Sequence, residues 1–151
     1  MGWRIGEILI QKKWIDWWQL QEALEENKRT KEYTGSILVR KGHISNFLLH
    51  QALAEQFSMR FVDLPKTRIN PKAIEKIPRS IAQKYSLIPV ELYGDVLQVG
   101  ISNPMNAWPE SELKQLANVK EIKTVLCMPA DIQKAIEEQY GGKGTASVPP
   151  R

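Results

Sequence analysis

The sequence predicts an α+β fold, with a helical N-terminal part of about four helices and a smaller α/β part with about three strands. Two observations predict it: residues 4–27 and 33–56 repeat one another in a helical pattern, and strand-like apolar runs follow between residues 87 and 126. At 151 residues and 42% hydrophobic content, the chain can bury a core as one domain or two small subdomains.

The first half of the chain contains an internal repeat. At a fixed offset of 29 residues, as from Gly6 to Gly35, the residues of the first stretch meet like residues of the second. The further matches are Ile8 with Ile37, Leu9 with Leu38, Lys12 with Lys41, Ile15 with Ile44, Leu20 with Leu49, Ala23 with Ala52, Leu24 with Leu53 and Glu26 with Glu55. Such dense similarity indicates a duplicated unit, which suits a helical stack or a binding site for a two-fold ligand.

Each repeat unit is predicted to be a short helix, a turn and a longer helix. Asp16 is a good N-cap for the long helix of the first unit. In the second unit, Gly42 can end the short helix and Ser45 can cap the long one. The stretch Lys28-Arg29-Thr30-Lys31, which has three basic residues, is predicted to form a linker between the repeat units.

Beyond Arg60 the pattern changes to a mixture of strands and helices. Phe61–Pro65 is predicted to be extended, and Gly94-Asp95 is a hairpin cue. The predicted strands are Leu87–Tyr93, Val96–Ile101 and Glu121–Leu126, and the predicted helices begin near Pro71, Pro78, Pro109 and Ala130. We therefore divide the chain into a tandem helical repeat (residues 1–58), an α+β companion subdomain (59–142) and a flexible tail (143–151) rich in Gly, Ser and Pro.

Charge and cysteine content narrow the classes of partner and compartment. The chain has 21 Lys and Arg against 17 Asp and Glu, a formal charge of +4, which mildly favours anionic partners such as nucleotides, nucleic acid or acidic proteins. One cysteine, Cys127, excludes an internal disulfide, and with only His43 and His50 beside it no zinc pattern forms. No apolar run approaches the roughly 20 residues of a membrane-spanning helix. We expect a soluble, cytoplasmic protein without a metal and without membrane insertion.

The sequence lacks the familiar signals of catalysis. The chain has no G-x-x-x-x-G-K-[ST] phosphate loop, since Gly141-Gly142-Lys143-Gly144-Thr145 has the wrong spacing. No Ser/His/Asp set, Cys/His dyad or close carboxylate pair stands out. We expect a non-catalytic protein without a cofactor. Binding to DNA is not expected, because the positive charge is spread along the chain.

The repeat resembles the tandem motif of the MshEN domain, also described as the N-terminal domain of type II secretion and type IV pilus assembly ATPases. The family pattern begins Arg-Leu-Gly, continues through an apolar short helix to a turn glycine, and places Leu-x-x-x-Leu-x-x-Gln along the second helix. The rest of the chain looks like the family's companion subdomain, in Ile77-Pro78, Ala82-x-Lys84-Tyr85, Leu87-Ile88-Pro89-Val90, Leu97-x-Val99, Asn103-Pro104, Asp131-Ile132 and Tyr140. The resemblance covers about residues 3–142, and we expect these 151 residues to lack the family's ATPase motor.

The resemblance implies binding of cyclic di-GMP, a bacterial second messenger with two guanines and two phosphates. Gly6 and Gly35, at helix starts, would let a phosphate approach backbone N–H groups. Arg4 would stack on or hydrogen-bond a guanine or pair with a phosphate. Leucines would supply apolar surface for the bases, and Gln56 a side-chain amide. The candidate ligand-binding residues are Arg4, Ile5, Gly6, Leu20, Leu24, Asn27, Tyr33, Thr34, Gly35, Leu49, Leu53, Gln56 and Asn103.

The chain departs from the family pattern in both units. Tyr33-Thr34 replaces Arg-Leu in the second unit, while in the first Lys13 replaces Gly and Asn27 replaces Gln. Asn103 stands where many relatives have Asp before Pro. A tyrosine can stack on a base but cannot supply the fork of arginine donors, so the second half-site is altered and binding should be lopsided.

Each feature also has a structural interpretation. The leucines at helical spacing can be core, and Gly6 and Gly35 can be sites of close helix packing. Trp17 and Trp18 cannot both face one side of a helix, so at least one is expected to be exposed or at an interface. The alternative function is therefore a protein-docking module of a secretion or pilus machine, with a vestigial nucleotide site. The expected protein partner in either case is a secretion or pilus assembly protein or ATPase.

Overall fold

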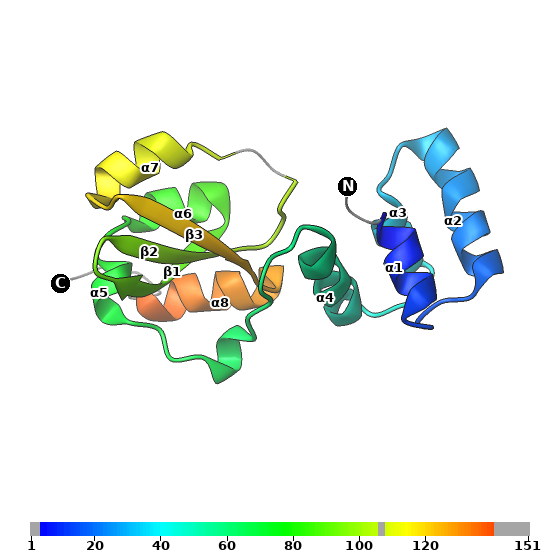
Figure 1. Cartoon of the computed structure of the whole chain (residues 1–151), viewed down its shortest axis with the longest axis horizontal. Coiled ribbons are helices and arrows are strands. Elements are labelled where there is room, and N and C mark those ends of the chain that lie inside the picture. The colour runs from blue at the N-terminus through cyan, green and yellow to red at the C-terminus, as the bar shows by residue number, and fades with distance from the viewer. Residues whose placement is uncertain (1–3, 106–107, 141–151) are drawn as a thin grey trace. The chain divides into compact units, whose positions relative to one another are not determined.

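The structure is a computed structural model that describes residues 4–105 and 108–140 (Figure 1). The chain divides into two compact units, Met1–Met59 and Arg60–Arg151, where the sequence analysis places the division after residue 58. The expected α+β class is confirmed: the described part of the first unit contains four helices, and that of the second contains a three-stranded sheet with its helices. The predicted tail, residues 143–151, lies outside the described residues.

The first unit consists of two pairs of helices, each a short helix followed by a longer one. They are α1 (Ile5–Gln11), α2 (Trp17–Thr30), α3 (Thr34–Arg40) and α4 (Asn46–Gln56). Ser45 caps α4, since its side chain accepts the Leu48 N–H at 3.1 Å. At the start of α2 the Asp16 N–H donates to Gln19 Oε1 at 2.8 Å. Both caps hold the turn of each pair in place.

The predicted linker at residues 28–31 is wrong, because α2 continues through Thr30. Lys28 and Arg29 are good helix formers, and their charges complement the C-terminal end of the helix dipole. The helix ends at Thr30, and its C-cap, Lys31, has a left-handed backbone (φ 65°) and an N–H that donates to the Asn27 carbonyl at 2.8 Å. The connection between the two pairs is correspondingly short.

The turns inside the two pairs share one backbone conformation. Gly42 follows the end of α3 with φ +79°, and Lys13 follows the end of α1 with φ +62°. The two residues are repeat equivalents. At the same left-handed position, the second repeat unit has a glycine and the first repeat unit has a lysine. The turn after α1 therefore keeps the left-handed backbone although it has Lys13 in place of a glycine.

The sheet of the second unit has the order β1-β2-β3. β1 (Leu87–Tyr93) and β2 (Val96–Ile101) form an antiparallel hairpin through Gly94, which has φ +61°. β3 (Glu121–Leu126) pairs in parallel with β2, after a crossover through α7 (Glu110–Ala117). All three strands have the predicted bounds.

Helices and one short turn complete the second unit. They are the 3₁₀ turn η1 (Leu64–Lys66), α5 (Pro71–Ile74), α6 (Arg79–Tyr85), α7 and α8 (Pro129–Gln139), and α6 and α8 contact β1. The segment predicted to be extended is so only at its start, where Phe61 bridges Leu126, because Pro65 favours the first turn of a helix. The core side chains include Leu87, Ile88, Leu97, Val99, Leu126, Ile132 and Ile136.

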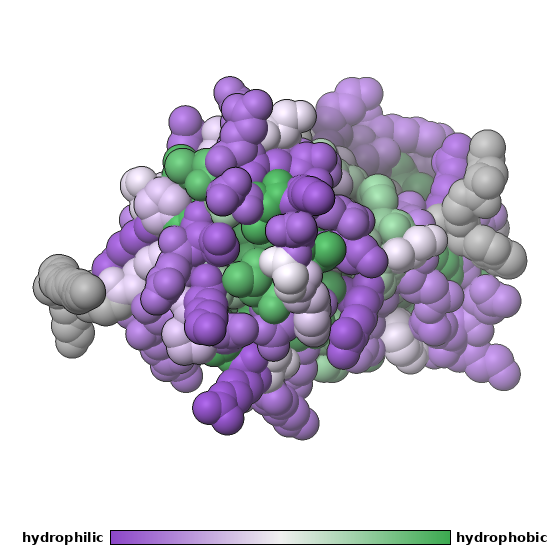
Figure 2. Space-filling model, turned by 60° about the vertical axis from the view of Figure 1, so that its left-hand side comes forward, coloured by the Kyte–Doolittle hydropathy of each residue, from purple (hydrophilic) through white to green (hydrophobic). Residues whose placement is uncertain are grey.

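On the face drawn in Figure 2, hydrophilic side chains cover most of the surface and apolar ones show between them in small groups. Among the described residues, no helix has the length and apolar character needed to cross a membrane.

Candidate functional site

Two equivalent lysine–glutamate ion pairs connect the repeat units by an exchange of partners. Lys12 Nζ lies 2.9 Å from Glu55 Oε1, and Lys41 Nζ lies 3.1 Å from Glu26 Oε1. Lys41 and Glu55 are the repeat equivalents of Lys12 and Glu26, so each unit gives a lysine to the other and receives one. The packing of the helices follows the same exchange, α1 with α4 and α3 with α2. Mutual contact between equivalent surfaces is the mark of a two-fold relation, here an approximate one inside a single chain.

Arg40 breaks this symmetry. Its guanidinium donates to Glu26 and, at 2.9 Å, to Glu32 Oε1. The equivalent residue of the first repeat unit is Gln11, which carries no charge. The hydrogen bond from Arg40, followed by that from Lys41, lowers the pKa of the Glu26 carboxyl below its usual value. Glu26 is therefore held as a carboxylate between two cations, and the junction of α2 and α3 carries more charge pairing than that of α1 and α4.

Gly6 and Gly35 are sites of close helix packing. A Cβ on Gly6 would lie 2.6 Å from Leu20 Cδ1, and one on Gly35 would lie 2.6 Å from Leu49 Cδ1. Both leucines are only 5% exposed. The structure thus supports the packing interpretation of the glycines, and the approach of a phosphate to them stays a prediction.

The other predicted leucines, Leu24 and Leu53, and the two predicted amide side chains lie in the long helices of the two repeat units. Leu24 and Leu53 are half-buried, so they keep more surface for a base than the two buried leucines do. Asn27 Nδ2 donates to the Glu32 carbonyl at 2.6 Å, which occupies part of its amide in a local bond. Gln56 is the last residue of α4 and is half-buried. The two amides, equivalent in the repeat, do not have equivalent surroundings.

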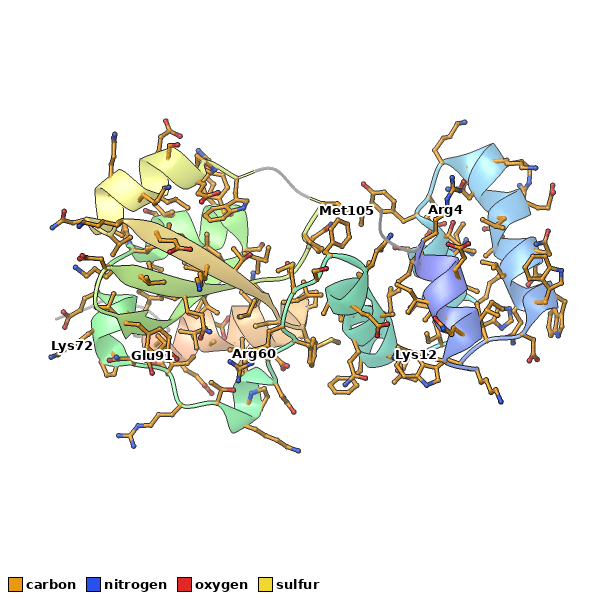
Figure 3. The ribbon with its side chains drawn as sticks, in the orientation of Figure 1. Arg4, Lys12, Arg60, Lys72, Glu91 and Met105 are labelled. Atoms are coloured by element: carbon orange, nitrogen blue, oxygen red, sulfur yellow. The ribbon has the colours of Figure 1, made fainter. Side chains whose placement is uncertain are left out.

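Arg4 and Tyr33 occupy matching places at the starts of the two short helices. Arg4 is the N-cap of α1 and Tyr33 the N-cap of α3. Arg4 is exposed, as Figure 3 shows at the start of α1, and Tyr33 is 57% exposed. Ile5 and Thr34, the next residues, are half-buried. Both N-cap side chains are available to a ligand.

Two polar residues beside these N-caps were missed by the sequence analysis. Glu7 Oε1 accepts the Arg4 backbone N–H at 3.0 Å, which holds the carboxylate next to Arg4. Ser36 is its repeat equivalent in α3, and both are exposed. The alignment of the two units was the signal that could have found them, since it pairs position 7 with position 36.

His43 connects the turn of the second repeat unit to α2. Gln19 Oε1 accepts the Asp16 N–H, so the amide nitrogen of Gln19 faces His43 Nδ1 at 3.2 Å. His43 Nε2 lies 3.2 Å from Glu22 Oε1, and the ring meets Trp18 edge-on at 5.7 Å. In its neutral form His43 therefore carries its proton on Nε2 and donates to Glu22. These contacts give the histidine a structural role.

Other candidate groups are accounted for by local contacts. Asn103 belongs to the compact unit Arg60–Arg151 and accepts the Met105 backbone N–H at 2.9 Å, so its contact with a ligand stays a prediction. Burial raises the pKa of the Cys127 thiol to about 12, which keeps it protonated at neutral pH. Within the described ranges, no group of three or more His, Cys, Asp or Glu could hold a metal ion.

Trp17 and Trp18 form an exposed aromatic pair at the start of α2. They are 64% and 59% exposed, where the sequence analysis expected at least one exposed ring. Tryptophan is enriched in protein interfaces relative to the rest of the protein surface. The pair is a candidate docking surface.

Comparison with known proteins gives the family. Residues 57–146 match the MshEN domain, and the chain belongs to this family. It is 31% identical over 144 residues to the type IV pilus assembly ATPase PilB of Myxococcus xanthus, covering 95% of this chain and 25% of that protein. It is 31% identical over 141 residues to PilB of Thermus thermophilus (93% and 15%), and 34% identical over 136 residues to bacteriophage adsorption protein B of Escherichia coli K12 (90% and 18%). The chain thus spans a quarter or less of these relatives.

Solved structures share the fold. A structure of MshE with cdg matches with a TM-score of 0.79 and 22% identity, covering 91% of this chain and 99% of that one. The N-terminal domain of XpsE matches with a TM-score of 0.63 and 15% identity, covering 91% and 97%. The family predicted from the repeat and the companion subdomain together is confirmed, and the matched residues 57–146 lie almost entirely in the companion subdomain.

Proposed function

We propose that this chain is a non-catalytic regulatory domain that binds cyclic di-GMP through its tandem repeat. The observation that carries the proposal is the exchange of Lys12–Glu55 and Lys41–Glu26 ion pairs between the units. It supports an approximate two-fold arrangement of the repeat, and cyclic di-GMP is itself nearly two-fold, with one guanine and one phosphate for each half. Each repeat unit would contact one half of the ligand.

The comparisons support the same ligand and setting. Cdg, named with the MshE structure, stands for cyclic di-GMP, and that structure has the fold of this chain. The PilB relatives are pilus assembly ATPases in which the matching region is a small part of the chain. We propose that this domain needs no cofactor, performs no hydrolysis itself, acts in the cytoplasm, and passes ligand occupancy to a secretion or pilus assembly protein or ATPase.

Arg4 is the residue on which a test of binding should centre. It is exposed at the N-cap of α1, so its guanidinium can make charge-assisted hydrogen bonds without disturbing the core. Isothermal titration with cyclic di-GMP should show binding, and Arg4→Ala should weaken it by about 1–3 kcal/mol. Arg68→Ala, at an exposed arginine of the second unit, is the matched control and should leave the affinity unchanged. The absence of heat and of thermal stabilisation at near-millimolar ligand would refute the proposal.

The second candidate function, a protein-docking module, is favoured by the exposed Trp17 and Trp18. Purified chain should then capture a candidate secretion or pilus component, and Trp17→Ala or Trp18→Ala should weaken the capture while circular dichroism shows an intact fold. Tyr93→Ala, at an aromatic that is 60% exposed in the second unit, serves as the control. Equal capture by wild type and both tryptophan variants would contradict this function.

A further inference from the structure

The two half-sites differ in chemistry at positions that the fold makes equivalent. Arg4 and Tyr33 are both N-caps with nearly the same backbone, φ −73° and ψ 152° against φ −59° and ψ 138°. Three residues further on, Glu7 of α1 is matched by Ser36 of α3. The first half-site therefore presents a guanidinium and a carboxylate, and the second presents two hydroxyl groups.

The charged pair of the first half-site is suited to guanine. An arginine fork donates to guanine O6 and N7, the commonest specific contact with this base. A carboxylate accepts from the N1–H and N2–H of guanine, and Glu7 is held beside Arg4 by its bond to the Arg4 N–H at 3.0 Å. Adenine carries an amino donor where guanine carries O6, so it cannot satisfy the same fork. The pair can thus discriminate between the two purines.

The hydroxyl pair of the second half-site has no such preference. The hydroxyls of Tyr33 and Ser36 can each donate or accept, so they can meet the amino group of adenine or O6 of guanine. The ring of Tyr33, 57% exposed, can stack on either base because every base has a π-face. The second half-site therefore lacks the arginine fork that would select guanine, and its hydroxyl groups can accept either purine.

We propose that the tandem repeat accepts an unsymmetrical cyclic dinucleotide, with one guanine and one adenine, as readily as cyclic di-GMP. This inference rests on the proposed function and assigns guanine to the Arg4 half-site and either purine to the Tyr33 half-site. A bidentate base contact discriminates by roughly tenfold or more, and only one half-site makes it. The affinity for the mixed ligand should then lie within about threefold of that for cyclic di-GMP, and cyclic di-AMP should bind at least about tenfold more weakly.

The experiment is a titration of the 151-residue chain with each of the three cyclic dinucleotides. Tyr33→Arg would give the second half-site a guanine reader and should shift the preference toward cyclic di-GMP over the mixed ligand by about tenfold. Tyr93→Arg adds the same charge at a similarly exposed tyrosine, 60%, and should leave the preference unchanged. Both sites are exposed, so thermal unfolding should confirm that both variants fold.

The outcomes separate this inference from the proposed function. Cyclic di-GMP binding at least tenfold more tightly than the mixed ligand in the wild type would overturn the inference and leave the proposed function standing. Equal preferences in Tyr33→Arg and wild type would overturn the role of Tyr33. A failure of all three ligands to bind would overturn both proposals.

Discussion

Lys13 adopts a left-handed backbone that its repeat equivalent, Gly42, adopts without strain, so Lys13→Gly should stabilise the first unit. A residue with a Cβ pays about 1–2 kcal/mol in this conformation. Glycine itself lowers the free energy of unfolding by about 0.5–1 kcal/mol, because it loses more chain entropy on folding. Taken between the middles of the two ranges, the net gain in the free energy of unfolding should be about 0.5–1 kcal/mol.

Urea unfolding followed by tryptophan fluorescence is a suitable assay. Of the tryptophans that the structure describes, Trp14, Trp17 and Trp18 lie in the compact unit Met1–Met59 and only Trp108 lies in the other, so the signal reports mainly on the repeat. With a urea dependence of about 2 kcal/mol/M, the midpoint should rise by roughly 0.3–0.5 M. Lys13→Ala removes the amine but keeps the Cβ, so it should leave the midpoint in place. If Lys13→Gly is no more stable than Lys13→Ala, the reasoning from backbone conformation is refuted.

Two further predictions concern packing and pH. Gly6→Ala should destabilise the fold by about 1 kcal/mol, because its Cβ would lie 2.6 Å from Leu20 Cδ1, but should become neutral or stabilising in a Leu20→Ala background. The same urea assay measures it, and equal costs in both backgrounds would argue against the contact. Arg40 and Lys41 lower the pKa of Glu26, so its contribution to stability is present above the usual value of 4.5 and is lost as the pH falls through the lowered value. Glu26→Gln should flatten the fall in stability below pH 4.5, in urea unfolding measured at several pH values, more than Glu25→Gln does.

The strands of the sheet were predictable because their signals are local. Apolar runs with a Gly94-Asp95 turn define the hairpin, and Glu121–Leu126 is a short apolar-alternating run between turn residues. The repeat was predictable for a different reason, since it compares the chain with itself. Local pattern failed at Lys28–Thr30, where two basic residues and a threonine suggested a linker but form the last turn of α2.

The candidate site was less predictable, because its contacts join residues distant in sequence. From the sequence alone, Gly6 is equally compatible with a phosphate site and with close helix packing. The structure favours packing, because Leu20 lies against Gly6. The partners of Lys12 and Lys41 depend on which unit packs on which, and that is a property of the tertiary structure. Lys13 shows a third limit, since its repeat position indicates a glycine turn, while its side chain gives no sign that the left-handed backbone is kept.

The exchanged lysines bear on how such an arrangement can be assembled. Both of these lysine–glutamate pairs join the C-cap lysine of a short helix to a glutamate of a long helix, and each repeat unit contains both types of residue. A polypeptide with only one unit would have to pair with an identical copy to satisfy them. The present chain contains its own dimer partner, and because the two copies are joined covalently, their sequences are free to diverge as Arg4 and Tyr33 have.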